Sequence, residues 1–117
     1  MGFGSKMRKI NKPRKGIKIM VKHIVVWRLA DAPNKTEIAN NMKTALEALK
    51  DKIDEIIDIE VGINFNDSEF ASDVVLVSTF ASKEALDAYI VHPEHKAVGA
   101  NYVRPNVSER RVIDYEF

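Results

Sequence analysis

The amino-acid sequence predicts an α+β domain in which helices cover one side of a four-stranded sheet. Three observations support this prediction. Segments with the two-residue period of strands alternate with segments that have the three-to-four-residue period of helices. The turn-forming residues Pro, Asn, Asp and Ser lie between these segments. The length of 117 residues suits one domain.

The body of the domain begins with a predicted strand over Val21–Leu29, which is rich in β-branched and aromatic residues. Alternation along this strand separates two sets of side chains. One face carries His23, Val25, Trp27 and Leu29, and the other carries Ile24 and Val26. Because both faces are largely apolar, we expect both to be covered.

A helix follows the turn that Asp31, Pro33 and Asn34 mark. Asn34 and Glu37 predict a capping box, in which the Asn34 side chain accepts a backbone hydrogen bond. Apolar residues then recur at spacings of three and four, which is the stripe of an amphipathic helix. They are Ile38, Met42, Ala45, Leu46, Leu49 and Ile53. The helix is expected to end near residues 52–55.

Two more strands are predicted on either side of a short loop. Residues 57–65 alternate strictly between apolar and polar, which indicates a strand with one solvent-exposed side. Asn66, Asp67 and Ser68 open the loop. Residues 73–80 form the next strand, and the short connection makes it the antiparallel partner of the preceding one.

The remaining chain predicts two short helices and a closing strand. Ser82 caps a helix that continues to Ile90. Pro93 disfavours helical geometry at His92 and suits the first turn of another helix, which continues to about residue 101. Residues 111–117 are predicted as the last strand.

The resulting order of elements, β-α-β-β-α-β with one extra short helix, is the ferredoxin-like arrangement. Its helices cover one side of the sheet and leave the other side bare. Ile24, Val26, Val75 and Val77 make that bare side apolar. We therefore expect a second copy of the chain to cover it and form a homodimer.

The composition excludes several classes of protein. The chain is 45% hydrophobic and 30% charged, as is ordinary for globular domains. No apolar run approaches the roughly 20 residues of a membrane span, so no membrane association is expected. The chain contains no cysteine, which excludes disulfides and thiolate metal sites. A cytoplasmic location is compatible with this composition and is our expectation.

The first part of the chain differs in charge from the rest. Residues 1–20 contain seven basic residues and no acidic one, whereas all 17 acidic residues lie in the body. We interpret residues 1–19 as a solvated extension that precedes a domain over 20–117. Two alternatives are a basic arm that binds nucleic acid or an anionic surface, and a translation start at Met20. Nucleic-acid binding is not expected, because basic and aromatic residues do not interleave and the acidic body would repel phosphates.

The densest polar cluster of the chain lies in residues 89–95. Tyr89 and His92 are three residues apart on one predicted helix and share a face. His95 lies in the first turn of the next helix, where free amide groups and the positive end of the helix dipole favour a neutral imidazole. A neutral imidazole can accept a proton, so His95 is a candidate general base. The negative charge of the adjacent Glu94 has the opposite effect, because it favours the protonated imidazole.

Other interpretations of the histidines remain open. His92, which precedes a proline at a helix break, also suits a capping role, and His23 also suits a core position on an apolar strand face. No HxH or HExxH spacing is present, so we expect no metal site. No glycine-rich phosphate loop or GxSxG motif occurs, and no cofactor is predicted.

Four segments resemble the stress-responsive dimeric α/β-barrel (Dabb) family: residues 21–27, 73–80, 88–95 and 112–115. The strand histidine His23 and the later signature Tyr-x-x-His-Pro-x-His are the most specific parts of this resemblance. It covers nearly all of residues 20–117. The family implies a ferredoxin-like subunit whose sheet packs against that of its partner, which gives a dimeric barrel.

The resemblance also implies a chemistry, because the family includes plant olivetolic acid cyclases. It implies that His95 is the general base and that Tyr89 is its hydrogen-bonding partner. The base would remove a proton from a carbon between carbonyls, and the enolate would attack a second carbonyl, with burial of the apolar tail orienting the substrate. The expected binding residues for a small apolar carbonyl compound are His23, Val25, Trp27, Leu76, Phe80 and His92.

Two other functions are compatible with the sequence. One is a non-catalytic, stress-related ligand-binding or structural dimer, in which Trp27 or Phe80 fills the pocket. The other is a monooxygenase, as in related dimeric barrels, some of which act on haem. An open pocket beside Tyr89 and His95 would favour the enzyme.

Overall fold

The computed structural model describes residues 18–117, so the interpretation of residues 1–19 as an extension lies outside the described residues for all but its last two positions. The strands are β1 (Val21–Leu29), β2 (Asp58–Ile63), β3 (Val74–Phe80) and β4 (Val107–Glu116). The helices are α2 (Lys35–Glu47), α3 (Lys83–Val91) and α4 (Pro93–Val98). A 3₁₀ turn (Ala48–Asp51) extends α2, and a π-helical segment (Gly99–Val103) with a second 3₁₀ turn (Arg104–Asn106) connects α4 to β4.

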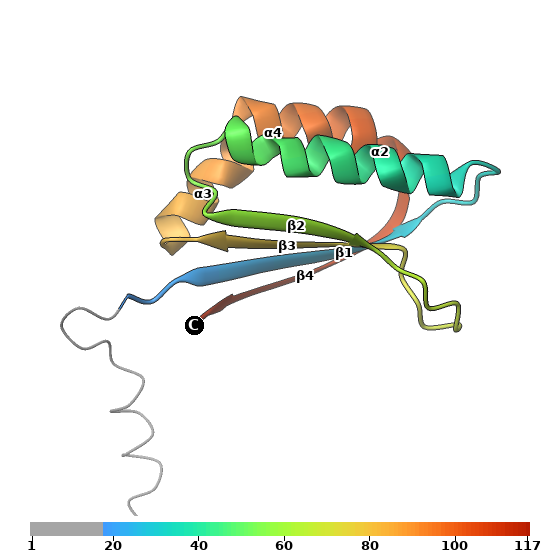
Figure 1. Ribbon diagram of the computed structural model, residues 1–117, viewed down its shortest axis with the longest axis horizontal. Coiled ribbons are helices and arrows are strands. Elements are labelled where there is room, and N and C mark those ends of the chain that lie inside the picture. The colour runs from blue at the N-terminus through green and yellow to red at the C-terminus, as the bar shows by residue number, and fades with distance from the viewer. Residues whose placement is uncertain (1–17) are drawn as a thin grey trace, which may run out of the picture.

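The four strands form one antiparallel sheet in the order β2-β3-β1-β4. All three helices lie on the same side of this sheet, as Figure 1 shows. The order of elements and the strand order are those of a ferredoxin-like α+β fold, so the predicted fold class is confirmed.

The core lies between the sheet and the helices. Alternate residues of β1 point into it, and Val21, Val25 and Trp27 are each less than 5% exposed. The apolar stripe of α2 and of the 3₁₀ turn that extends it faces them, with Met42 of the helix and Leu49 of the turn fully buried. Each such side chain contributes roughly 1.5–3 kcal/mol through removal of apolar surface from water. This packing holds the helices on the sheet and positions the residues between them.

None of the helices of residues 18–117 lies over the opposite face of the sheet. Ile24 lies opposite Val77, and Val26 lies opposite Val75, in the register between β1 and β3. All four are half-buried, and Ile113 on β4 continues the patch with 63% of its surface exposed. The predicted apolar bare face is therefore present in the subunit.

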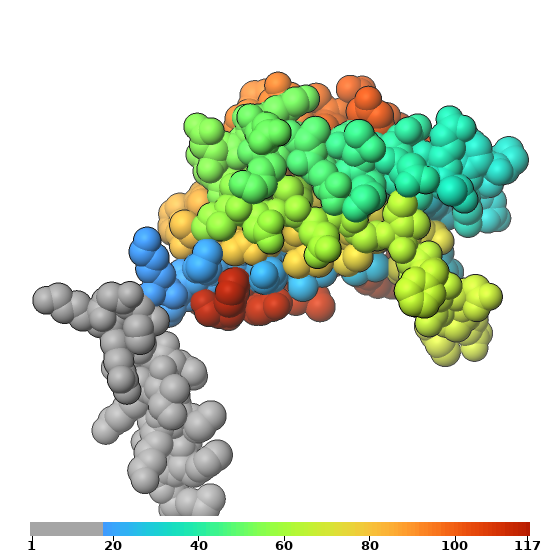
Figure 2. Space-filling model, in the orientation of Figure 1, coloured from blue at the N-terminus to red at the C-terminus, as the bar shows by residue number. Residues whose placement is uncertain are grey.

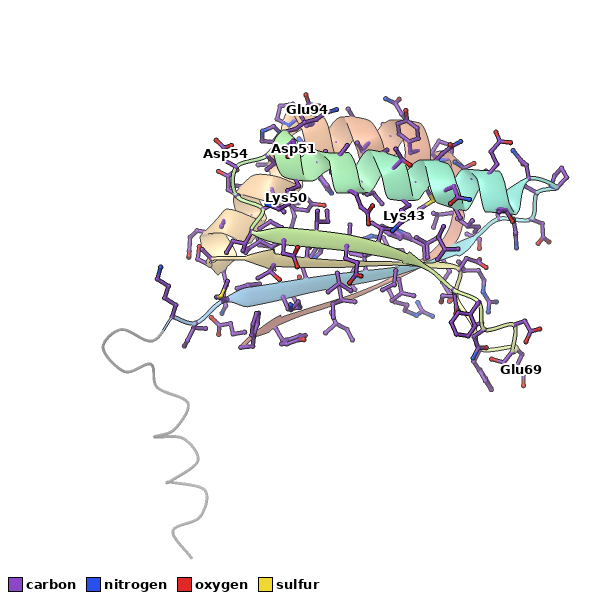
Figure 3. All side chains as sticks on the ribbon, viewed as in Figure 1. Lys43, Lys50, Asp51, Asp54, Glu69 and Glu94 are labelled. Carbon is purple, nitrogen blue, oxygen red and sulfur yellow. The ribbon has the colours of Figure 1, made fainter. Side chains whose placement is uncertain are left out.

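The outer edge of β2 is closed by side chains from α2. Lys43 Nζ donates a hydrogen bond to the carbonyl oxygen of Val61, and the backbone N–H of Val61 donates to Glu47 Oε2 at 3.0 Å. Lys43 also pairs with Glu47 at 2.9 Å. Figure 3 shows Lys43 reaching from α2 toward the sheet. These bonds satisfy edge groups that would otherwise be open to another strand.

Several predicted boundaries and one cap were wrong. Asn34 precedes α2, but its side chain makes no capping hydrogen bond, so there is no capping box. The α-helix ends at Glu47, earlier than predicted, because its last turns tighten into a 3₁₀ turn. β2 ends at Ile63, because Asn64 turns the chain by accepting a hydrogen bond from Asn66 N. In contrast, the Ser82 cap is confirmed, with Ala85 N donating to its hydroxyl at 3.1 Å.

Two features of the last third of the chain are also corrected. The helix predicted to run from Pro93 to about residue 101 is α-helical only to Val98 and continues as the π-helical segment. β4 begins at Val107 rather than at Arg111. Among residues 18–117, no helix combines the length and the apolar character that a membrane crossing requires.

Candidate active site

A cavity of about 320 Å³ lies between the sheet and the helices. Its volume is within the usual range for small-molecule sites. β1 supplies His23, Val25 and Trp27. The other lining residues come from the helices, from β3 and β4, and from the segments that connect α4 to β4. They are Leu46, Leu76, Tyr89, His95, Gly99, Val103, Arg104 and Arg110.

The break between α3 and α4 positions the histidine of this cavity. His92 is extended, with φ −65° and ψ 135°, and its Nδ1 accepts a hydrogen bond from Glu94 N at 3.1 Å. Pro93 then begins α4, as its fixed φ allows at a first helical position. The change of direction brings His95 back against α3, where its ring lies 4.4 Å from that of Tyr89.

His95 has one ring nitrogen occupied and one available. Its Nδ1 lies 3.0 Å from the carbonyl oxygen of Ile90. A carbonyl oxygen only accepts, so Nδ1 carries the proton and, in the neutral ring, Nε2 is the basic nitrogen. Burial lowers the pKa of His95 below its ordinary value, and this outweighs the opposing effect of the Ile90 hydrogen bond. The imidazole is therefore neutral at pH 7, which is the form that accepts a proton.

Tyr89 is almost completely buried, with 1% of its surface exposed. Its ring is tilted 47° from that of His95. Burial raises the pKa of Tyr89 to about 12, against the opposing positive charge of Arg110. The phenol is therefore protonated at neutral pH and can donate a hydrogen bond.

His23 enters the same cavity from the sheet. It is 4% exposed, and its ring lies edge-on to Tyr89 at 6.1 Å. On its other side, His23 Nδ1 lies 2.5 Å from Asp114 Oδ1 on β4, the strand that pairs with β1. Because the carboxylate accepts the Nδ1 proton, Nε2 is the nitrogen left for a ligand.

The predicted site residues divide into two groups. His23, Val25, Trp27, Leu76, Tyr89 and His95 line the cavity. Phe80 and His92 do not. Phe80 is fully buried behind the site, with its ring 5.0 Å from that of Tyr89, and His92 caps α4.

Trp27 does not fill the cavity but forms part of its wall. Its ring is buried, and its indole Nε1 is the only buried side-chain polar atom without a hydrogen-bond partner among residues 18–117. Such an unpartnered donor is rare in folded proteins. The cavity remains open beside this side chain.

Sequence reasoning missed Asp114, Arg104 and Arg110. Asp114 could have been found from the alternation of the closing strand, since it lies on the same face as the inward residues of β1. Arg110 lies outside the predicted strand, which began one residue later, so its direction was not assigned. Within the described part of the chain, no group of three His, Cys, Asp or Glu side chains is placed to hold a metal ion.

Comparisons with known proteins agree with this architecture. A dimeric protein of unknown function and ferredoxin-like fold from Bacteroides fragilis is 40% identical to this chain; the match covers 84% of this chain and 96% of that one, with a TM-score of 0.77. A dimeric ferredoxin-like protein of unknown function from Thermobifida fusca is 22% identical over 86% and 92% of the two chains, with a TM-score of 0.73.

A hydroxynitrile lyase from Passiflora edulis is 17% identical over 84% of this chain and 93% of the lyase, with a TM-score of 0.72. At this identity it shows a shared fold alone. No curated protein matches the chain. The family model described as the stress responsive A/B barrel domain (Dabb) matches residues 21–117. Since this match spans most of the sequence, the chain belongs to the Dabb family.

Proposed function

We propose that this protein is a homodimer in which each subunit binds a small carbonyl compound and transfers a proton to or from it. The observation that carries the proposal is the orientation of His95. Its Nδ1 proton is held by the Ile90 carbonyl, which leaves a basic Nε2 beside the buried hydroxyl-bearing ring of Tyr89. A base and a hydrogen-bond donor that face one cavity are the two groups that enolisation uses.

His95 Nε2 takes a proton from the carbon next to the carbonyl, and the C–H electron pair becomes the carbon–carbon double bond of an enolate. The negative charge moves to the carbonyl oxygen, where the Tyr89 hydroxyl donates a hydrogen bond to it. The protonated His95 then returns its proton to carbon or oxygen. Where a second carbonyl is in reach, the enolate carbon attacks that carbonyl carbon before the proton is returned. A carbon–carbon bond forms, the electron pair of the C=O π bond moves to oxygen, and the resulting alkoxide takes the proton from His95.

The surroundings of the pair favour this chemistry. Val25, Trp27 and Leu76 make an apolar wall that orients a hydrocarbon chain and limits the water around the enolate. His23 adds a third polar group to the cavity, and its Nε2, left as an acceptor by the Asp114 contact, suits a hydroxyl group of the substrate. A cyclase, lyase or isomerase reaction is consistent with this set.

The homodimer is supported by the bare apolar face and by the relatives. The Bacteroides fragilis protein, 40% identical, is described as dimeric. In this chain, Ile24, Val26, Val75 and Val77 form an apolar patch over which none of the described helices lies (Figure 1). The loop after β2 projects on this side of the sheet, as the space-filling view shows in yellow-green (Figure 2). Phe65 and Phe70 of this loop are 100% and 87% exposed, which suits contact with a partner.

Deuterium exchange tests the catalytic part of the proposal. Purified protein is incubated in D₂O with a panel of methyl ketones and β-diketones, and loss of the α-proton signals is followed by ¹H NMR against buffer alone. We expect the wild-type protein to accelerate exchange. His95→Gln should abolish the acceleration, and Tyr89→Phe should reduce it by about tenfold or more, because a positioned donor to the enolate oxygen is lost.

Lys96→Gln is the matched control, since it changes an exposed neighbour of His95 on the same helix. It should leave the exchange rate unchanged. If the panel binds in the cavity but wild type and His95→Gln exchange it at equal rates, the catalytic proposal is wrong. The remaining function would then be that of a ligand-binding dimer.

A further inference from the structure

Two arginines from different elements reach the cavity that holds Tyr89 and His95. Arg104 follows the π-helical segment, and Arg110 lies on β4 directly opposite Trp27. Both line the cavity, and both are exposed overall, so each side chain has contact with solvent as well as with the cavity. Among the described lining residues there is no Asp or Glu to neutralise them.

Neither arginine is committed to an ion pair. Within residues 18–117, no carboxylate oxygen lies within 4.0 Å of Arg104 or Arg110, although the chain forms such pairs elsewhere. The next residue on the same strand provides a contrast. Arg111 faces the opposite side of the sheet and pairs with Glu109 at 2.9 Å. The two cavity arginines therefore carry positive charge that is available to a ligand.

Arg104 is folded against the wall of the cavity. Its Nη1 lies 3.9 Å from the position that a Cβ on Gly99 would occupy, and Gly99 itself lines the cavity. The guanidinium thus lies on the π-helical segment rather than extending away from it. Segments of π-helix occur frequently at functional sites.

The charge of Arg110 acts on the proposed catalytic pair. Burial is the larger influence, and it raises the pKa of Tyr89 and lowers the pKa of His95. The positive charge of Arg110 lowers the pKa of both groups. Arg110 is therefore close enough to Tyr89 and His95 to act on both electrostatically, so a carboxylate bound to it would lie in the same cavity as a ketone at that pair.

We propose that Arg110 and Arg104 bind the carboxylate of a small oxo acid whose ketone lies against Tyr89 and His95. This inference rests on the proposed function and names its substrate class. Guanidinium groups match carboxylates through paired N–H donors, which gives both orientation and strength. The apolar wall formed by Val25, Trp27 and Leu76 accommodates the carbon chain between the two ends. A cavity of about 320 Å³, roughly the volume of ten water molecules, limits the ligand to a short acid.

The test compares three ligands that differ only at one end. 6-Oxoheptanoate carries the ketone and the carboxylate, its methyl ester keeps the size without the charge, and 2-heptanone lacks the group. We expect the full-length wild-type protein to bind the acid about tenfold or more tightly than the ester, as measured by calorimetry or ligand-observed NMR. Arg110→Gln should remove most of this preference. Arg110→Lys should retain only part of the preference for the acid, because lysine keeps the positive charge but lacks the paired N–H donors of the guanidinium.

Lys50, labelled in Figure 3, is exposed and is not among the residues that line the cavity, so Lys50→Gln removes the same charge and should not alter the preference. Equal affinity of wild type for acid and ester would overturn the inference, as would an equal loss in Lys50→Gln and Arg110→Gln. Competition separates the anion types: hexanoate should displace the oxo acid better than inorganic phosphate does. The reverse order would assign the arginines to phosphate and overturn the carboxylate assignment.

The same samples show separately whether the carboxylate assignment or the proton-transfer function fails. Deuterium exchange of 2-heptanone that depends on His95, without any preference for the acid, would support the proton-transfer function and overturn the arginine assignment. Binding of the acid that depends on Arg110, without any deuterium exchange, would support the arginine assignment and overturn the proton-transfer function.

Discussion

His23 of β1 and Asp114 of β4 lie directly opposite each other in the sheet, and the Nδ1 atom of the imidazole lies 2.5 Å from the carboxylate. The contact joins a buried residue of the cavity to a half-exposed carboxylate at the sheet edge. It holds the His23 ring in one orientation and determines which nitrogen carries the proton. A pair of this kind links the chemistry of the cavity to the edge strand.

Asp114→Ala should therefore disturb His23 without unfolding the domain. We expect long-range ¹H–¹⁵N NMR spectra of wild type to show His23 with its proton on Nδ1, and the variant to show a mixture of tautomers. Exchange activity should fall by about tenfold, as a positioning residue is lost. Asp87→Ala removes another exposed carboxylate and is the control. An unchanged His23 spectrum in Asp114→Ala would contradict this role.

The pH dependence of exchange should follow His95. Burial lowers the pKa of His95 below its ordinary value of 6.5. The neutral form is the base, so kcat/KM should rise with pH through this lowered pKa and reach its plateau near neutrality. Burial raises the pKa of Tyr89 to about 12, so no falling limb is expected up to about pH 10. Half-maximal activity well above pH 6.5 would exclude His95 as the base.

A charge on the bare sheet face should break the dimer. Val77 lies opposite Ile24 at the centre of this face. Val77→Glu would place an unpaired carboxylate in an apolar interface, at a cost of several kcal/mol for each copy. We expect light scattering after gel filtration to show monomer or aggregate. Thr44→Glu, on the exposed side of α2, should remain dimeric. A stable dimer of Val77→Glu would place the interface elsewhere.

Phe65 and Phe70, the two exposed phenylalanines of the loop after β2, should contribute to the dimer interface on the bare sheet face. The loop that carries them is anchored by Arg28, whose guanidinium donates to the carbonyl oxygens of Glu69 and Ala71. Phe65→Ser with Phe70→Ser should raise the dimer dissociation constant by about tenfold or more, because two large apolar contacts are lost. The melting temperature measured at high protein concentration should change little. If dissociation is unaffected, the loop does not contact the partner.

Glu47 should stabilise the fold by closing the edge of β2. Burial alone would raise its pKa, but the hydrogen bond from Lys43, with that from Val61 N, outweighs this, so the pKa of Glu47 lies below 4.5. Its contribution is present above pH 4.5 and is lost as the pH falls through the lowered pKa. Glu47→Ala should lower the free energy of urea unfolding at pH 7 by about 1 kcal/mol. Glu84→Ala, exposed on α3, is the control. Equal effects of both variants would contradict this role.

Local patterns predicted much of this fold. The bounds of β1, the Ser82 cap and the helix break at His92 and Pro93 agree with the structure because each depends on residues that are near one another in sequence. The start of β4 was missed because Val107–Glu116 opens with a run that has no clean apolar alternation. These residues become a strand because β1 offers them backbone partners, from Leu29 opposite Val107 onward.

The sequence by itself determined the order of elements, the apolar faces of the sheet and the Tyr–His cluster, because periodicity, caps and short spacings are local. Only the tertiary structure decided that the cavity stays open beside Trp27, that His92 caps a helix outside the cavity lining, and that Arg104 and Arg110 enter that lining. These outcomes depend on strand register and on the packing of α4 over the sheet. Both arise from contacts between residues that are distant along the chain, which no local pattern specifies.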